Sequence, residues 1–493
     1  MQVRQLRAVM ESKYNVVCFE NLADYNQNSA LLYQLFHRHY QQAYEHQQRL
    51  ILYCAGEPSP KLIAHIKRAA DVIDISHCFI LICCNTNNPN GFEQLELFKV
   101  NIDSEPLAPD QLIDLDQFCP MPFASVSVHN QGRAKCCCVF ESPHDNVQTS
   151  NLQQVFYHPS MQSLRQQFVQ GIRPQGCSHC WQLEDNNLPS HRQWYLPHYE
   201  KSMFVEDWIG SPQIRIMDVR PSNVCNFKCR VCGPSDSSLY AVESLTHAKS
   251  DLEKSAIKNI LIQGQWFDDN PNLFDQIIQQ LDYIQHLEFY GGEPFLLKQL
   301  PKIFSAAIEL GVANRIDLHF NTNGSIWPDK ILDQLSRFKK VEIAISIDNI
   351  EDRFELERGG QWDVIQRHVI RYQQLGHPFE ISVMPLVNVQ NVLYLPELVD
   401  WAEKHKLKML FQYLDQPQYL NIDTLTLQAK QLVISKLTSH GHPELKNIAE
   451  RIQSSQGSDG VEFVTKMKQF DKYRNQDFYL SHSAIAEAMG YML

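Results

Sequence analysis

The chain has 493 residues, 44% of them hydrophobic and 20% charged, and its formal net charge is −12 at pH 7. At roughly 100–200 residues per domain, two to four globular domains are expected. The acidic balance disfavours nucleic acid as a partner, because an average negative field repels phosphates. The sequence has no apolar run of about 18 residues and no apolar signal-peptide core at its N-terminus, so we expect a cytoplasmic protein without a membrane partner.

Residues 1–115 predict a small α/β domain of unknown role. Three apolar runs, NVVCF, RLILYCAG and CFILICCN, are typical of short buried strands, and a helical pattern separates the first two. A segment with three prolines and several acidic residues, 104–120, then predicts a linker. The cysteines in these apolar surroundings are expected to be small buried hydrophobes, and they are Cys18, Cys54, Cys78, Cys83 and Cys84.

Residues 116–205 form the next expected unit. The stretch ASVSVHNQGRAKCCCVF alternates on both sides of Asn130, Gln131 and Gly132, which predicts a β-hairpin with its turn at NQG. The stretch SMQSLRQQFVQGIRPQ has a helical period that ends near Gly171.

From 206 to 418 the pattern becomes regular, because short strands alternate with amphipathic helices. Such alternation predicts a parallel sheet with right-handed crossovers, either partly closed into a barrel or open. The predicted strands lie in QIRIMDVR, HLEFYGG, RIDLHFNTNG, KVEIAISIDN, FEISVMPLVN and KMLFQYLD. The remaining segment, 419–493, is expected to be mostly helical.

All fourteen cysteines lie in the first half of the chain, and the last three stand at the spacing C-x3-C-x2-C in VCNFKCRVCG. Clustered cysteines in a large chain without a signal peptide indicate metal or redox chemistry. Structural zinc needs four ligands, and a [4Fe–4S] cluster is normally held by four thiolates. Three thiolates therefore leave one position for another ligand. The loop follows the first strand of the regular series, at the sheet edge where ligands bind.

This loop, with Cys225, Cys229 and Cys232, resembles the signature of the radical S-adenosylmethionine (SAM) superfamily. The resemblance implies a partial (β/α)6 TIM-like barrel and a [4Fe–4S] cluster whose fourth iron is chelated by SAM. It also implies reductive cleavage of SAM to a 5′-deoxyadenosyl radical, with electrons from a reductant such as flavodoxin or ferredoxin. Two loop residues fit the family pattern: Val231, the apolar residue near the adenine, and the aromatic Phe227.

Motifs at later strand ends extend the resemblance over about 210–418. In FYGGEP, Gly291, Gly292 and Glu293 match the family motif that hydrogen-bonds the SAM amino group. Glycine permits close backbone approach, and a carboxylate is a natural acceptor for an ammonium group. Polar residues that in the family bind the SAM ribose and carboxylate, or else simply cap turns, are Asn323, Ser346 and Arg358, with Asp348, Arg353 and Asn388 as further candidates.

A second cysteine group resembles the auxiliary-cluster modules called twitch, or SPASM in longer form, although such modules usually follow the core and this one precedes it. The resemblance implies a second iron–sulfur cluster, with a zinc ribbon as the alternative. The expected ligands are Cys119, Cys136, Cys177 and Cys180. Cys137 could replace Cys136, because adjacent strand residues point to opposite faces, and Cys138 could share the face of Cys136.

The sequence therefore predicts a radical SAM enzyme that abstracts hydrogen from a peptide or protein side chain. A radical SAM enzyme for a sugar or small metabolite is one alternative, and a non-catalytic zinc-binding interaction protein is the other. No residue stands out as a catalytic acid or base.

Overall fold

The structure is a computed structural model of residues 1–493, and it describes four strands before residue 117 and then 117–141, 144–185, 190–202, 209, 212–264, 266–267 and 271–491. The chain divides into two compact units. The first consists of Met1–Ala124 and Ser163–Gln213, and the second of Ser125–Gln162 and Ile214–Leu493.

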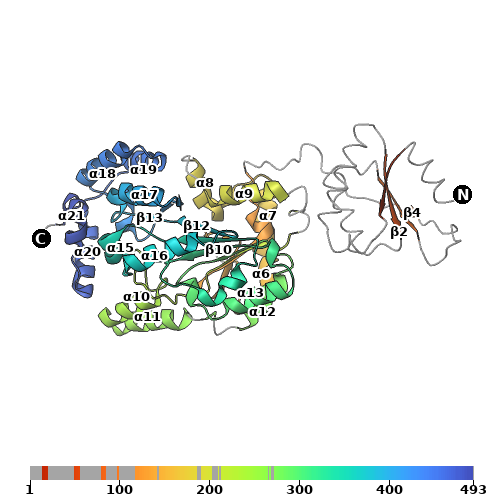
Figure 1. The fold of residues 1–493 in the computed structure, drawn as a ribbon, viewed down its shortest axis with the longest axis horizontal. Helices are drawn as coiled ribbons and strands as arrows, with labels where there is room; N and C mark the ends of the chain where they lie inside the picture. Colours follow the sequence, from red (N-terminus) through yellow and green to blue (C-terminus); the bar gives the residue numbers. More distant parts are fainter. Residues whose placement is uncertain are drawn as a thin grey trace. The chain divides into compact units, whose positions relative to one another are not determined.

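The first unit contains a four-stranded sheet with the order β1-β2-β3-β4 (Figure 1). The first three strands are parallel and β4 is antiparallel to β3, so the three predicted strands are confirmed. Their bounds are Tyr14–Phe19, Arg49–Ala55, Phe79–Cys84 and, for β4, Leu97–Phe98. The predicted helix between them, most of the linker and the surroundings of the five cysteines lie outside the described residues.

Helices α5 and α7 to α9 follow, with bounds Met121–Ala124, Pro159–Val169, Ser178–Asp185 and His191–Ser202. The predicted helix is α7, which ends before Gly171, a residue with φ of 68°. A positive φ is accessible to glycine without steric cost, so Gly171 stops the helix where the sequence pattern does.

The second unit is built on a nine-stranded sheet with the order β14-β12-β11-β10-β9-β8-β5-β6-β7. All pairs from β14 to β5 are parallel, as the alternating pattern predicts, and β5, β6 and β7 form antiparallel pairs. In chain order, the bounds of β5 to β12 and then of β14 are Ser125–Val128, Arg133–Lys135, Asp145–Asn146, Ile216–Val219, His286–Phe289, Asp317–Thr322, Lys340–Ile345, Phe379–Val383 and Lys408–Met409. The predicted turn at NQG is confirmed, because a short 3-10 segment, Asn130–Gly132, joins β5 to β6.

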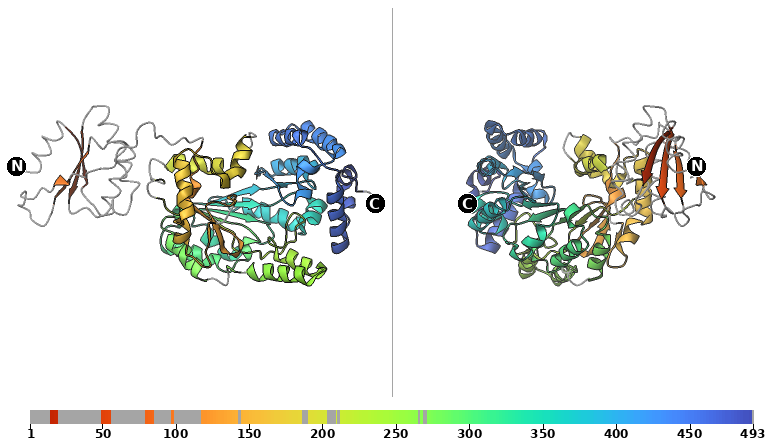
Figure 2. Two further views of the ribbon diagram at one scale, coloured as in Figure 1. Left: turned by 180° about the vertical axis from the view of Figure 1, so that it is seen from behind. Right: turned by 45° about the vertical axis from the view of Figure 1, so that its right-hand side comes forward.

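A further two-stranded sheet pairs β13 with β15, at Leu386–Val387 and Gln412–Tyr413. Helices surround the large sheet (Figures 1 and 2). Besides α7 to α9, the helices that lie between β7 and β14 in the chain are α6, Leu152–Phe156; α10, Ser238–His247; α11, Asp251–Gln263; α12, Pro271–Gln280; α13, Leu300–Glu309; α14, Leu332–Leu335; α15, Glu351–Arg358; α16, Trp362–Gln373; and α17, Leu395–Lys404. The C-terminal segment is helical as predicted, with α18, Leu427–His440; α19, Pro443–Ser454; α20, Val461–Arg474; and α21, Phe478–Ala488. No helix in the described part of the chain combines the length and apolar composition that a bilayer crossing requires.

The helix-facing side of the sheet is apolar and closely packed. Phe289 and Phe320 stack at 5.6 Å between ring centroids, and both meet Phe304 of α13 edge-on at 6.2 Å. All three rings are fully buried. Alternate strand residues therefore anchor the helices and leave the other face of the sheet to different side chains.

Truncating Phe304 to alanine should lower the free energy of unfolding by about 3–5 kcal/mol, because it removes a buried ring and leaves a cavity. Phe304→Leu, which keeps most of the volume, should cost less than the alanine variant. Urea unfolding followed by tryptophan fluorescence measures both. A loss below about 1 kcal/mol in Phe304→Ala would show that this packing does not anchor α13.

Candidate active site at the strand ends

The cysteine loop leaves the C-terminal end of β8 and leads into α10. Its thiols are close together: Cys232 donates a hydrogen bond that lowers the pKa of Cys229 to about 7. Burial, together with the charge of the nearby Cys229, raises the pKa of Cys225 to about 11. The Phe227 N–H donates to Cys225 Sγ at 3.4 Å. One short loop thus carries three cysteine sulfurs that could bind metal, in largely buried surroundings.

The Gly-Gly-Glu-Pro turn touches the beginning of this loop. Gly292 has a φ of 61°, and a Cβ atom there would lie 2.4 Å from the Val224 carbonyl oxygen. The next residue, Glu293, donates its N–H to the same oxygen at 2.8 Å. Only glycine allows this approach, so the turn after β9 and the residue before Cys225 are in direct backbone contact.

The Glu293 carboxylate joins the turn to the end of β10. It is fully buried, and it accepts hydrogen bonds from Thr322 Oγ1 at 2.8 Å and from the Asn323 N–H at 2.8 Å. The Phe295 N–H also donates to it, at 3.2 Å. Burial raises the pKa of Glu293 to about 7 despite these donors. The carboxylate therefore ties two strand ends together, and its backbone ties both to the cysteine loop.

Two further predicted residues lie at the thiols. Asn323 Nδ2 donates to Cys225 Sγ at 3.8 Å and to Asn226 Oδ1 at 2.9 Å. Arg358, at the end of α15, pairs with Asp348 at 2.5 Å, and its own carbonyl accepts from Cys229 Sγ at 3.6 Å.

The guanidinium Nε of Arg358 is buried and has no hydrogen-bond partner among the described residues. It is therefore a cation with an unused donor beside the loop.

The structure places the other predicted residues as follows. Phe227 is buried against Gly360, where a Cβ atom would lie 2.1 Å from its ring. Val231 is half-buried within the loop. Ser346 directly follows β11, and its N–H donates to the Thr322 carbonyl at 2.9 Å.

The further candidates have other partners. Arg353 pairs with Glu397 and lies over the Tyr394 ring. Asn388 is fully buried, and it donates to the Leu386 carbonyl at 2.8 Å. Both are engaged in local structure.

These residues fit an iron–sulfur cluster with SAM. Three thiols are available as metal ligands, and the adjacent Arg358 cation suits an anionic cluster. Because Gly292 has no side chain, the backbone of the turn can approach the cysteine loop closely. Within the described residues, no three Cys, His, Asp or Glu side chains surround a position for a single metal ion.

The predicted ligands of the second cluster lie in different units. Cys119 and Cys180 are buried in the first unit, where both add to the negative potential at Arg192. Cys177 precedes α8 by one residue, so Cys177 and Cys180 are three residues apart at the start of a helix.

The prediction that strand alternation separates Cys136 and Cys137 is wrong. Strand β6 ends at Lys135, and Cys136 to Cys138 continue as a turn in the second unit. A hydrogen bond joins the thiols of Cys136 and Cys137 and lowers the pKa of Cys137. Adjacent cysteines can therefore face one another here, because the backbone is no longer extended.

Arg230 lies inside the cysteine loop, and no sequence motif marks it as a site residue. Its side chain is fully buried, and Nη2 donates to Asp471 Oδ1 at 2.6 Å and to Gln476 Oε1 at 2.9 Å. Asp471 lies on α20, and its other oxygen accepts from Tyr491 at 2.7 Å. The C-terminal helices are thus attached to the loop that carries the thiols.

A row of ionisable residues on the sheet face opposite the phenylalanines was also missed. Asp218, Glu288, His319 and Glu342 stand opposite one another in strand register. Ser127 Oγ donates to Asp218 Oδ2 at 2.8 Å, so the row extends into β5. Barrel interiors are usually filled with branched apolar side chains. The available signal was the polar residue at every second position in segments such as DLHFN and HLEF.

The charges along this row differ. Burial and the charge of Glu288 raise the pKa of Asp218 to about 7. Burial opposes the charged form of His319, but the hydrogen bond to Glu342 and the charge of Glu288 outweigh it and raise its pKa to about 9. Burial likewise opposes ionisation of Glu342, yet His319 lowers its pKa to about 2. His319 and Glu342 therefore form an ion pair at neutral pH, with Nδ1 and Oε2 separated by 3.3 Å.

Residues 219–402 match the family model described as the Radical SAM superfamily, so the chain contains a radical SAM superfamily domain. The match begins at the last residue of β8 and ends in α17, and it covers less than half of the chain. No curated protein matches the chain.

Solved structures of SuiB from Streptococcus suis are similar at 13% identity. The structure bound to S-adenosylmethionine aligns with a TM-score of 0.29 over 50% of this chain and 48% of that chain. The structure bound to the precursor peptide SuiA has a TM-score of 0.28, with 55% and 52% covered. A third SuiB structure has a TM-score of 0.30, with 62% and 60% covered. The chain thus spans between 48% and 60% of the length of these structures.

Asp471→Asn should destabilise the protein by about 3–5 kcal/mol, because it leaves the buried Arg230 without its counter-charge. Glu462→Gln, an acid-to-amide change at an exposed position of the same helix, should have little effect. Chemical unfolding under anaerobic conditions compares the two variants. Equal stability of both would mean that the ion pair does not hold α20 to the loop.

The contribution of His319 to stability should disappear at high pH. The pKa is raised from 6.5 to about 9, so the contribution is complete below 6.5 and is lost as pH rises through 9. The difference in unfolding free energy between wild type and His319→Gln should shrink by on the order of 3 kcal/mol across this window. Urea unfolding at several pH values tests the trend, and a constant difference would contradict the charged pair.

Proposed function

We propose that the chain is a radical SAM enzyme. The proposed ligands of its catalytic [4Fe–4S] cluster are Cys225, Cys229 and Cys232. The Gly-Gly-Glu-Pro turn would hold the methionyl end of SAM at the remaining iron. The observation that carries the proposal is the backbone contact between turn and loop, in which the Glu293 N–H donates to the Val224 carbonyl at 2.8 Å. The family match over 219–402 supports it independently.

When bound, the reduced cluster and SAM supply a 5′-deoxyadenosyl radical, which abstracts hydrogen from the substrate. The chain's own residues would bind and position these groups. Arg358 offsets negative charge beside the thiols, and Asn323 donates to the Cys225 sulfur. Arg230 anchors the loop to α20, which keeps that side of it away from water.

The proposal includes a second iron–sulfur cluster held by Cys119, Cys136, Cys177 and Cys180, with Cys137 as the alternative to Cys136. Its support is the cysteine pattern around the hairpin, together with the burial of Cys119, Cys136 and Cys180. Such a cluster would transfer electrons if all four ligands bind, or hold substrate if one iron stays open.

The proposed substrate is a peptide or protein side chain. The ionisable row of the sheet supports a polar substrate, because these groups would be costly to bury against an apolar one. The additional α/β domain gives a peptide-binding enzyme a second surface for recognition. A sugar or small metabolite would need no such domain.

Anaerobically purified protein should be coloured, contain iron and sulfide, and release 5′-deoxyadenosine from SAM with dithionite. Cys229→Ala should lose this cleavage, whereas Cys54→Ala, in β2 of the first unit, should retain it. Iron, sulfide and zinc counts with a visible spectrum provide the measurement. A colourless protein that contains only zinc and never cleaves SAM would identify a zinc-binding interaction protein instead.

The substrate class has its own test. Deuterium should pass into 5′-deoxyadenosine from labelled peptides. If only labelled small metabolites transferred deuterium, the peptide part of the proposal would fail while the enzyme class would stand.

A further inference from the structure

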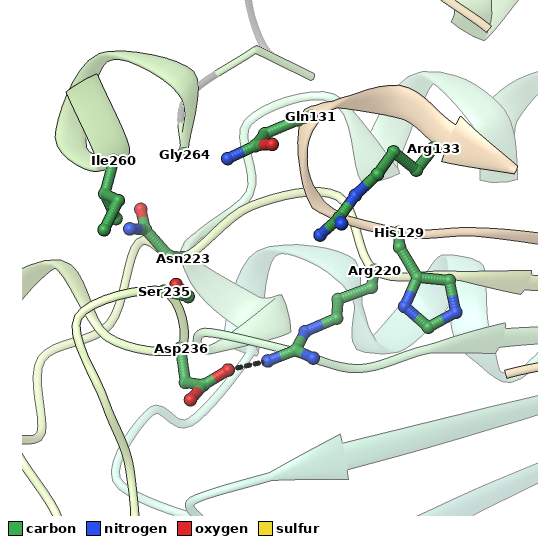
Figure 3. A pocket seen from close by; sticks show the side chains of 9 residues that line it. All are labelled: His129, Gln131, Arg133, Arg220, Asn223, Ser235, Asp236, Ile260 and Gly264. Atoms are coloured by element: carbon green, nitrogen blue, oxygen red, sulfur yellow. Dashed lines mark hydrogen bonds and ion pairs between the residues drawn. The ribbon is translucent and has the colours of Figure 1, made fainter. Parts of the chain in front are cut away.

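A small pocket of about 80 Å³ opens beside the cysteine loop in the second unit (Figure 3). His129 follows β5, Arg133 begins β6, and Arg220 follows β8, so three neighbouring strands contribute one basic side chain each. Figure 3 shows Arg133, Arg220 and His129 on one side of the pocket, with Asn223 and Asp236 across from them.

The pocket has more positive than negative groups. Asp236 is the acid among its lining residues; Oδ1 pairs with Arg220 Nη2, and Oδ2 accepts from the Gly233 N–H at 3.1 Å. Arg133 has no ion pair with any described residue, and its side chain is exposed. Two guanidinium groups therefore face a single carboxylate whose oxygens are both engaged.

Arg220 also has an unused donor. Its Nε is buried and has no hydrogen-bond partner among the described residues. A buried N–H without an acceptor is costly, so this position favours an acceptor from outside the chain. A guanidinium group matches two oxygens of a carboxylate or phosphate in a bidentate arrangement.

The pKa of His129 reflects its burial and the positive charges around the pocket. Burial lowers its pKa, and the charges of Lys135, Arg220 and Arg133 lower it further, to about 3. The imidazole is therefore neutral at neutral pH, and its Nε2 lies 3.1 Å from Ser127 Oγ. It can contribute a hydrogen bond to a ligand but no charge, which leaves the two arginines as the source of attraction.

The pocket adjoins the proposed active site through shared residues. The Arg220 side chain crosses Gly291, where a Cβ atom would lie 2.3 Å from Arg220 Cγ. Asn223, which lines the pocket and is 1% exposed, stands two residues before Cys225. A ligand group bound here would be fixed next to the turn and the loop.

We propose that this pocket binds an oxyanion of the substrate, a carboxylate or a phosphate, through Arg133 and Arg220. Calling the ligand a substrate rests on the proposed function, whereas the binding of an oxyanion does not. The proposal restricts the substrate class to molecules with an anionic group near the carbon that loses hydrogen.

Isothermal titration under anaerobic conditions tests the binding, with inorganic phosphate and succinate as separate probes on the holoenzyme. Arg133→Gln should weaken binding of at least one probe about tenfold or more, the equivalent of one charge-assisted hydrogen bond. Arg337→Gln, the same change at an exposed position elsewhere in this unit, should bind like the wild type. The preferred probe distinguishes a phosphate-bearing ligand from a carboxylate-bearing one.

Absence of binding to the wild type, or equal binding by Arg133→Gln, would overturn the proposal. SAM cleavage by dithionite without substrate should be the same in wild type and in the control variant Arg337→Gln. If the wild type bound phosphate or succinate through Arg133 but never cleaved SAM, the proposed function would fail and the anion site would remain.

Discussion

The hydrogen bonds of Glu293 are the interaction on which the site depends. Its carboxylate accepts from Thr322 and Asn323 at the end of β10, and its backbone N–H donates to Val224 at the start of the cysteine loop. Three separate chain segments therefore meet at one buried residue. A buried carboxylate is stable only when its oxygens are hydrogen-bonded. The hydrogen bonds that Glu293 needs are made to the end of β10, and its backbone N–H bonds the cysteine loop, so this residue holds the loop, the turn and the strand end together.

The rest of the second unit supports this junction. Phenylalanines on one face of the sheet anchor α13, while ionisable residues on the other face leave a polar surface. Arg230 extends the junction outward, because its ion pair with Asp471 attaches the C-terminal helices to the loop. The cysteine loop is thus supported by strand ends on one side and by helices on the other. The basic pocket adjoins this arrangement through Arg220, which contacts the same turn.

The parallel strands and the loops that carry the cysteines were predictable, because both depend on local patterns. The alternation of short strands with amphipathic helices predicted the six parallel strands. The cysteine spacing and the Gly-Gly-Glu-Pro turn predicted which loops would form the site. The Arg230 pair was not predictable, because its partner lies 241 residues away in the chain. The hydrogen bonds that the Glu293 carboxylate accepts from Thr322 and Asn323 were not predictable either, because the motif with which Glu293 was compared implies only an ammonium partner. The prediction that Cys136 and Cys137 point to opposite faces of a strand was wrong, because β6 ends one residue before Cys136.

Electron paramagnetic resonance of the reduced protein tests most directly whether loop and turn form one site. The account predicts a signal from a reduced iron–sulfur cluster that changes when SAM is added. In Glu293→Gln, one oxygen acceptor is replaced by a donor facing other donors, so the change on adding SAM should be lost while iron is still bound. If SAM left the wild-type signal unchanged, or altered the variant's signal equally, the loop and the turn would not act together on SAM.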